Sequence, residues 1–264
     1  MNIYDEIIKA QKDKKDFAVL MIIKSGGSVP RHESSKMIVF ADGSITGTIG
    51  GGILEKQSID EAIKAIQQGK SKLIEIKSDT GSLLSLACGG NAVVFVEVHK
   101  ARPKLILCGA GHVNKAISYI ADTVDFDITV IDSRPEWANK QRYPEANNIV
   151  INEDMAMAIE EQNTNSDTFF VIATWDHKWD KDALKIVLKK QHRYIGMIGS
   201  RKKVEEIFIQ LKSEGMQQSS LDEVFTPVGL DIKAETPEEI ALSVMAEILM
   251  VKNCATGKSL SKLK

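Results

Sequence analysis

The sequence has 264 residues, 43% of them hydrophobic and 27% charged, and this composition excludes a disordered, collagen-like or coiled-coil chain. Its 34 Lys and Arg against 36 Asp and Glu give a net charge of −2, which provides no basic surplus for nucleic acid as the main partner. Three scattered cysteines favour a reducing compartment, and with neither a signal-peptide pattern nor an apolar run of the ~20 residues that a membrane span needs, we expect a cytoplasmic protein without a membrane partner.

The first hundred residues alternate between helix and strand patterns. An amphipathic helix is predicted over 3–12, and the unbroken apolar run 17–23 predicts a strand buried on both faces. A strand over 36–40 follows, and then a helix that starts after Gly50-Gly51-Gly52 and ends at Gly69 as its left-handed cap. Two further strands are predicted near 73–77 and 92–98.

A domain boundary is predicted at 99–103, where apolar periodicity stops at a charged, proline-containing stretch. We therefore expect a small N-terminal α/β domain over 1–100 and a second domain over 101–264. Strands in the second domain are predicted at 104–108, 127–132, 148–151, 168–173 and 194–198, with helical patterns between several of them. This rhythm predicts a Rossmann-like, doubly wound parallel sheet. Its last helix is predicted from a capping box at Thr236, Pro237 and Glu239.

The strand at 104–108 runs into Gly109-Ala110-Gly111-His112, and Asp132 ends the next strand 21 positions after Gly111. In a dinucleotide site the glycines let the backbone approach a pyrophosphate, the helix N-terminus supplies N–H donors, and the acidic residue holds ribose hydroxyls. Gly109, Gly111, His112 and Asp132 are therefore candidate ligand-binding residues, for NAD(P) or another phosphate-bearing ligand. The alternative is a Rossmann-like sheet that binds no nucleotide, and Asn114 stands where the third glycine is expected.

A second candidate anion site lies at the start of the helix that follows the strand at 194–198. Ser200, Arg201 and Lys202 follow the strand at 194–198, and cations in the first turn of a helix are unfavourable by ~0.3–1 kcal/mol each unless an anion offsets them. We expect Arg201, Lys202 and the turn at 109–111 to face one crevice and to bind the phosphate end of one ligand; the alternative is that these cations extend into solvent.

The N-terminal domain has its own candidate donors. Gly50, Gly51 and Gly52 would expose backbone N–H groups beside Ser28 and Arg31, and a simple tight turn is the alternative.

Cysteine and histidine provide the remaining candidates. Cys88, next to two glycines, is a candidate nucleophile or soft metal ligand, whereas Cys108 lies in an apolar strand and is expected in the core. In the loop 174–180, His177 is a candidate metal ligand or proton carrier, and a hydrogen-bonded loop with a helix N-cap at Asp180 is the alternative. The chain contains no zinc-type Cys/His spacing.

Several motifs in fixed order are more specific together than any one of them: Gly26-Gly-Ser-Val-Pro-Arg31 with Lys36-Met37, Gly47-Thr-Ile-Gly-Gly-Gly-Ile-Leu-Glu55, Cys88-Gly-Gly90, Gly109-Ala-Gly-His-Val113, Asp132-Ser-Arg-Pro-Glu136, Tyr194 to Lys203, and Pro227 to Ala241. The chain resembles the XdhC/CoxI family of xanthine dehydrogenase accessory proteins over nearly its whole length. Two positions depart from the family pattern: Ser34-Ser35 stands where a Gly-Ala pair precedes Lys-Met, and Trp175 stands where a His is usual.

The resemblance implies a maturation factor, more a non-catalytic chaperone than an enzyme. Such a protein would bind the molybdenum cofactor (Mo-molybdopterin), protect it for a sulfurating partner of the cysteine desulfurase type, and insert it into a xanthine dehydrogenase-type molybdenum hydroxylase. It also implies a homodimer. From its setting beside two glycines, we expect Cys88 to handle the cofactor near the molybdenum. An NAD(P)-dependent oxidoreductase or a nucleotide-binding regulatory module, each using the Gly109 to Gly111 turn, is the alternative.

Overall fold

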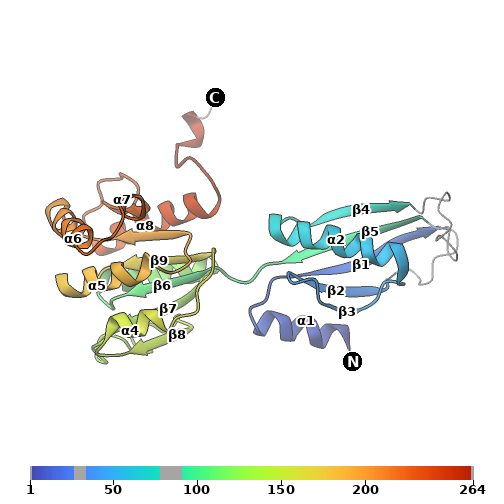
Figure 1. The fold of residues 1–264 in the computed structure, drawn as a ribbon, viewed down its shortest axis with the longest axis horizontal. Helices are drawn as coiled ribbons and strands as arrows, with labels where there is room; N and C mark the ends of the chain where they lie inside the picture. The colour runs from blue at the N-terminus through green and yellow to red at the C-terminus, as the bar shows by residue number, and fades with distance from the viewer. Residues whose placement is uncertain (1, 27–33, 78–90, 263–264) are drawn as a thin grey trace. The chain divides into compact units, whose positions relative to one another are not determined.

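The computed structural model describes residues 2–26, 34–77 and 91–262. The chain divides into two compact units, 1–101 and 102–264 (Figure 1). Within the described ranges, no helix combines the length and the hydropathy that crossing a bilayer would require.

The N-terminal unit is an antiparallel sheet with one helix on each face. Its strand order is β3-β2-β1-β5-β4, and every neighbouring pair is antiparallel. The elements are α1 (Ile3–Lys12), β1 (Phe17–Gly26), β2 (Lys36–Phe40), β3 (Ile45–Gly47), α2 (Gly52–Gln68), β4 (Lys72–Lys77) and β5 (Asn91–His99).

The central strand β1 is buried on both sides, as its apolar run predicts. Leu20 and Ile22 pack against Ala62 and Ile66 of α2, whereas Phe17 is in the cluster of α1 on the opposite face. The sheet therefore separates two small cores, one under each helix.

The C-terminal unit is a six-stranded sheet of order β11-β10-β9-β6-β7-β8, and each neighbouring pair is parallel. Its elements are β6 (Lys104–Cys108), α3 (His112–Thr123), β7 (Asp127–Asp132), β8 (Asn148–Ile151), α4 (Met155–Glu160), β9 (Thr168–Ile172), α5 (His177–Val187), β10 (Tyr194–Met197), α6 (Arg201–Ser213), α7 (Gln218–Leu221), β11 (Val224–Phe225), α8 (Pro237–Lys252) and the 3-10 turn Leu260–Lys262. Numbered from β6, this is the 3-2-1-4-5-6 order of the dinucleotide-binding fold. The predicted Rossmann-like sheet is confirmed.

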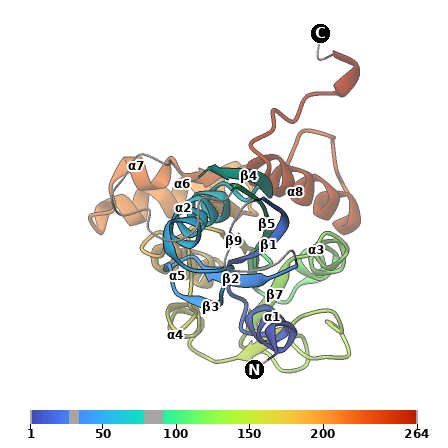
Figure 2. The same cartoon turned by 90° about the vertical axis from the view of Figure 1, so that its right-hand side faces the viewer.

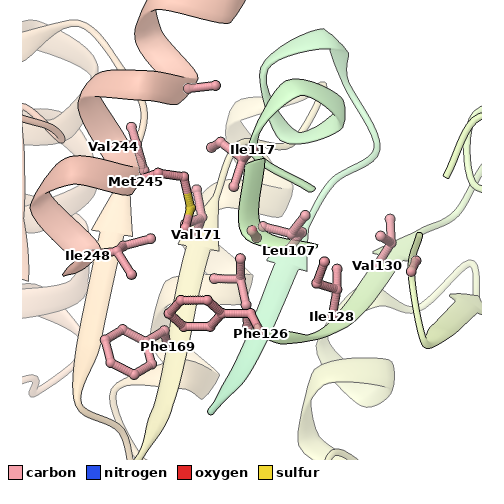
Figure 3. Close-up of a cluster of buried hydrophobic side chains, with 14 of the residues drawn as sticks. Leu107, Ile117, Phe126, Ile128, Val130, Phe169, Val171, Val244, Met245 and Ile248 are labelled. Carbon is pink, nitrogen blue, oxygen red and sulfur yellow. The ribbon is translucent and has the colours of Figure 1, made fainter. Parts of the chain in front are cut away.

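Helices cover both faces of this sheet, because side chains alternate along each buried strand. Leu107 faces α3 and α8, where it joins Ile117, Val244 and Met245 in the cluster that Figure 3 shows. The next residue, Cys108, faces the other side, where the cluster includes α4, α5 and α6. Figure 2 shows α3 and α8 on one side of the unit, and α5 and α6 on the other.

Helix α8 holds the loop that follows β11 in place through hydrogen bonds. Its N-cap is the predicted capping box, in which Thr236 Oγ1 accepts from Glu239 N and a Glu239 carboxylate oxygen accepts from Thr236 N. Farther along α8, one carboxylate oxygen of the buried Glu247 accepts from Tyr194 Oη at 2.7 Å and from Gly229 N at 3.0 Å. The helix thereby connects β10 to the loop after β11.

Candidate functional site

The candidate site is the edge of the parallel sheet where its strands end at their carboxyl termini. Strand β6 lies inside the sheet. The next two strands, β7 and β8, pair on one side of it, and β9, β10 and β11 then extend the sheet on the other side. Ligands of doubly wound folds bind in the crevice at this change of direction. The segments that can form the site are therefore those that follow β6, β7, β9 and β10.

The turn after β6, residues Gly109–Gly111 (the β6 turn), contains two glycines with different roles. Gly109 has φ +105°, and a Cβ there would lie 2.2 Å from the carbonyl oxygen of Ala173, so packing against the end of β9 demands glycine. Gly111, the N-cap of α3, has φ −72°, and a Cβ there would meet no atom within 4 Å. The space beside Gly111 is thus open for a ligand at the N-terminus of α3.

Two side chains hold the β6 turn in place. Asn114 is fully buried, and its Nδ2 donates to the carbonyl oxygens of Cys108 at 3.3 Å and of Gly109 at 2.8 Å. Tyr143 Oη donates to Gly111 O at 3.2 Å. The residue in place of the third glycine therefore stabilises the turn through hydrogen bonds.

Asp132, predicted to hold ribose hydroxyls, turns toward the protein instead. Its side chain is fully buried; Oδ2 accepts from Ala110 N at 2.7 Å, and Oδ1 accepts from Arg134 N at 3.0 Å. Burial alone would raise the pKa of Asp132, but hydrogen bonds from Arg134 and Ala110 outweigh it and hold that pKa below the ordinary carboxyl value. In this structure Asp132 positions the turn and Arg134, and it presents no surface to a ligand.

Arg134 is the side chain that the end of β7 presents. Its Nε and Nη2 donate to the two oxygens of Asp132 at 2.9 and 3.0 Å, a bidentate pair. Its guanidinium carbon lies 4.9 Å from the ring centre of Trp137 and 5.4 Å from that of Trp175. Because β6 lies between β7 and β9, the contact with Trp175 crosses the end of β6, a span of about 10 Å for two strand spacings.

Two more aromatic contacts complete this cluster. The guanidinium of Arg142 lies 4.5 Å from the ring centre of Trp137, and the ring of His112 meets Trp137 edge-on at 5.3 Å. The exposed His112 is thus held at the first position of α3, beside the β6 turn. We call Arg134, Trp137, Arg142 and Trp175 the arginine–tryptophan cluster. This cluster was not predicted from the sequence, although Arg134 stands inside the Asp132-Ser-Arg-Pro-Glu136 motif.

The cations at the start of α6 fall into two groups. Ser200 is the N-cap and its Oγ accepts from Lys203 N at 3.3 Å, while Lys203 Nζ pairs with the buried carboxylate of Asp180. Arg201 and Lys202 are exposed, and neither forms an ion pair with any residue in the described ranges. Lys203 is therefore compensated, whereas two positive charges at this helix N-terminus are not.

These two cations lie at the same sheet edge as the β6 turn, but not against it. Strand β9 separates β10 from β6, and the segment after β9 fills the space between them. There Asp180 Oδ1 accepts from Thr174 N at 2.9 Å and from Thr174 Oγ1 at 2.7 Å. A ligand must extend across the end of β9 to contact both.

Helix α5, which follows β9, begins before Asp180, the residue that one interpretation of the loop 174–180 predicted as its N-cap. Its N-cap is Asp176, whose carboxylate accepts from Lys178 N at 2.9 Å, and not Asp180, which is buried inside α5. An N-cap at Asp180 is therefore wrong, because Asp180 points back at Thr174. His177 is the first residue of α5, but its side chain lies outside the described part of the structure. No cluster of three metal-binding side chains occurs among the residues that are described.

In the N-terminal unit, two of the three candidate glycine donors, Gly50 N and Gly51 N, already have acceptors within the turn. Gly50, Gly51 and Gly52 all have positive φ, at +129°, +76° and +65°. Gly50 N donates to Thr48 Oγ1 at 3.0 Å, and Gly51 N donates to Glu55 Oε2 at 3.1 Å. The triple-glycine turn is therefore a self-capped helix start. Ser28, Arg31 and Cys88, the other candidates of this unit, lie outside the described residues.

Comparison with known proteins identifies both units. A family model described as the XdhC Rossmann domain matches residues 105–248, and one described as the XdhC and CoxI family matches residues 10–77. In solved structures, a xanthine dehydrogenase from Bacillus halodurans aligns with a TM-score of 0.53 over 99% of this chain and 98% of that one. At 20% sequence identity, this similarity concerns the fold alone.

Two curated relatives are similar in sequence. The uncharacterized protein YqeB of Escherichia coli (strain K12) is 40% identical over 264 residues, which cover 99% of this chain and 48% of that protein. A probable xanthine dehydrogenase subunit of Bacillus subtilis (strain 168) is 30% identical over 164 residues, which cover 60% of this chain and 46% of that protein. The chain spans about half the length of these relatives.

Proposed function

The chain belongs to the XdhC and CoxI family, and on that premise we propose that it is a maturation factor for a xanthine dehydrogenase-type molybdenum hydroxylase. The name of the Bacillus subtilis relative, a probable xanthine dehydrogenase subunit, supports the same class of partner. In this proposal the chain binds, protects and delivers a cargo, and it needs no catalytic residue of its own.

The proposed cargo is the molybdenum cofactor, a pterin with a terminal phosphate. The observation that carries this choice is the open space at Gly111, where the first turn of α3 leaves N–H groups without helical acceptors. The uncompensated charges of Arg201 and Lys202 lie at the same sheet edge. The N–H groups at Gly111 fit the phosphate of such a cargo, and Arg201 and Lys202 would attract the anionic cargo where it extends across the end of β9. Cys88 stays the candidate for contact with the metal.

The proposed function requires three partners: a second copy of the chain, a sulfurating enzyme and the hydroxylase that receives the cofactor. The chain would act as a homodimer in the cytoplasm, hold the cofactor for a sulfurating enzyme of the cysteine desulfurase type, and pass it to the apo-hydroxylase. Binding through exposed backbone donors and surface cations suits such a role, because a carrier must release its cargo as well as hold it.

The test uses the full chain purified from cells supplied with molybdate. We expect an oxidised pterin to be detected by its fluorescence after acid release, and the loaded protein to activate an apo-form of the hydroxylase. Arg201→Glu should lower pterin retention at least tenfold, because it replaces an attractive charge with a repulsive one. Lys189→Glu, which makes the same charge change near the opposite edge of the sheet, should leave retention unchanged. Absence of any pterin from the wild-type protein would contradict the proposal.

A further inference from the structure

We propose that the arginine–tryptophan cluster is an anion subsite that recognises a phosphate on the ribose of a nucleotide, with Arg134 as the residue that contacts it and Asp132 as a positioning residue. This inference goes beyond the proposed function, since it requires no molybdenum and no partner enzyme. It predicts a nucleotide ligand with a 2′-phosphate in the crevice that the cargo would use.

The position of Arg134 in the fold supports this assignment. In a sheet of this strand order, the diphosphate of a dinucleotide lies at the turn after the first strand, and the end of the second strand faces the ribose 2′ position. These places correspond here to the β6 turn and to the end of β7. An acidic side chain at the second place selects a 2′-hydroxyl, and an arginine selects a 2′-phosphate.

The orientations of Asp132 and Arg134 favour a phosphate over a ribose hydroxyl. Asp132 has no exposed surface, and its oxygens already accept from Ala110 and from Arg134, so it offers nothing to a ribose hydroxyl. Arg134 keeps a quarter of its side-chain surface exposed. Only Nε and Nη2 donate to Asp132, which leaves both Nη1 hydrogens and one Nη2 hydrogen of the five guanidinium donors.

The positive charge of the arginine–tryptophan cluster is only partly neutralised by described residues. Asp132 neutralises Arg134, but Arg142 forms no ion pair with a described residue, and its Nε and Nη2 atoms are buried without a hydrogen-bond acceptor there. Both guanidinium groups rest on Trp137, which fixes their planes. The uncompensated charge of Arg142 therefore favours binding of an anion beside Trp137.

The ring of Trp175 is also accessible to a ligand. It is 52% exposed, and it contacts Arg134 from the end of β9, across the β6 turn. A nucleotide whose diphosphate sits at Gly111 would therefore lie against this ring and Arg134. Because that ligand and the cargo would both use the N-terminus of α3, binding of one excludes the other.

The experiment compares two isomers, 2′,5′-ADP and 5′-ADP, which contain the same atoms and differ in where the second phosphate is attached. Binding to the full chain is followed by isothermal titration and by tryptophan fluorescence. We expect 2′,5′-ADP to bind at least tenfold more tightly than 5′-ADP. Arg134→Gln keeps a hydrogen-bond donor toward Asp132 but removes the charge, and it should reduce this preference to less than twofold.

Two further variants separate recognition from folding. Lys189→Gln removes a positive charge near the opposite edge and should keep the full preference. Trp175→Ala, at an exposed position, should weaken both isomers by a similar factor without lowering the melting temperature. Equal affinity of the isomers for the wild-type chain, no saturable binding of either, or a preference that survives Arg134→Gln would each overturn the inference. Pterin retention, measured separately, decides the proposed function whichever result is obtained.

Discussion

Substitution by alanine should lower the free energy of unfolding strongly at Gly109 and hardly at all at Gly111, the two glycines of the β6 turn. Gly109→Ala places a Cβ at φ +105°, which costs about 1–3 kcal/mol in backbone strain, and forces that atom within 2.2 Å of Ala173 O, which adds about 1–3 kcal/mol of overpacking. We expect a loss of about 2–6 kcal/mol in the free energy of unfolding. Gly111→Ala, at φ −72° with free space around it, should change that free energy by less than ~1 kcal/mol, because the lower entropy of the unfolded chain offsets the poorer N-cap.

The assay is urea unfolding followed by tryptophan fluorescence. All three tryptophans, at positions 137, 175 and 179, belong to the C-terminal unit, so this signal reports that unit without contribution from the other. Gly111→Ala is then the informative variant for binding: it should keep the fold and yet reduce pterin or nucleotide binding, because its methyl group occupies the space beside the helix N-terminus. Equal destabilisation by both substitutions would refute the assignment of one glycine to packing and the other to the ligand.

Three further changes test the contacts described above. Glu55→Ala removes the acceptor of the triple-glycine turn and should cost ~1–3 kcal/mol, seen as faster amide hydrogen exchange in that turn while β6 keeps its protection. Asp180→Ala leaves Lys203 unpaired and should lower the stability of the C-terminal unit by about 3 kcal/mol in urea unfolding, whereas Asp182→Ala, on the same helix, should have little effect. The lowered pKa of Asp132 adds stability above the unfolded value of ~3.9, which is lost as pH falls through the folded pKa. Asp132→Asn should flatten this acid dependence of the unfolding midpoint, and an unchanged slope would mean that other carboxyl groups cause it.

Elements with a strong local signal could be predicted from the sequence. The strand at 104–108 and the helix starting at Thr236 occur as expected, because an apolar run and a capping box are properties of neighbouring residues. The strands β3 and β11, of three and two residues, were not predicted, since so few residues show no periodicity. They form because a longer strand beside each provides hydrogen-bond partners.

The site was harder to predict because orientation is decided by tertiary contacts. Spacing placed Asp132 at the end of a strand, but not the direction of its carboxylate, which depends on Ala110 and Arg134. Trp175 is 41 positions from Arg134, and only the strand order brings them together. The triple-glycine turn did carry a local signal in Glu55, an acid in the first helical turn placed to satisfy the backbone donors.

The position of α8 has a consequence for how the chain folds as it is synthesised. Val244, Met245 and Ile248 complete the core that Leu107 begins, although Leu107 and Val244 are 137 positions apart (Figure 3). The N-terminal unit has all its strands once residue 99 has been made, whereas the parallel sheet exposes the part of one apolar face that α8 covers until that helix has left the ribosome. A chain truncated before Pro237 would keep every strand of that sheet and still present this face to solvent, as a target for chaperones or aggregation.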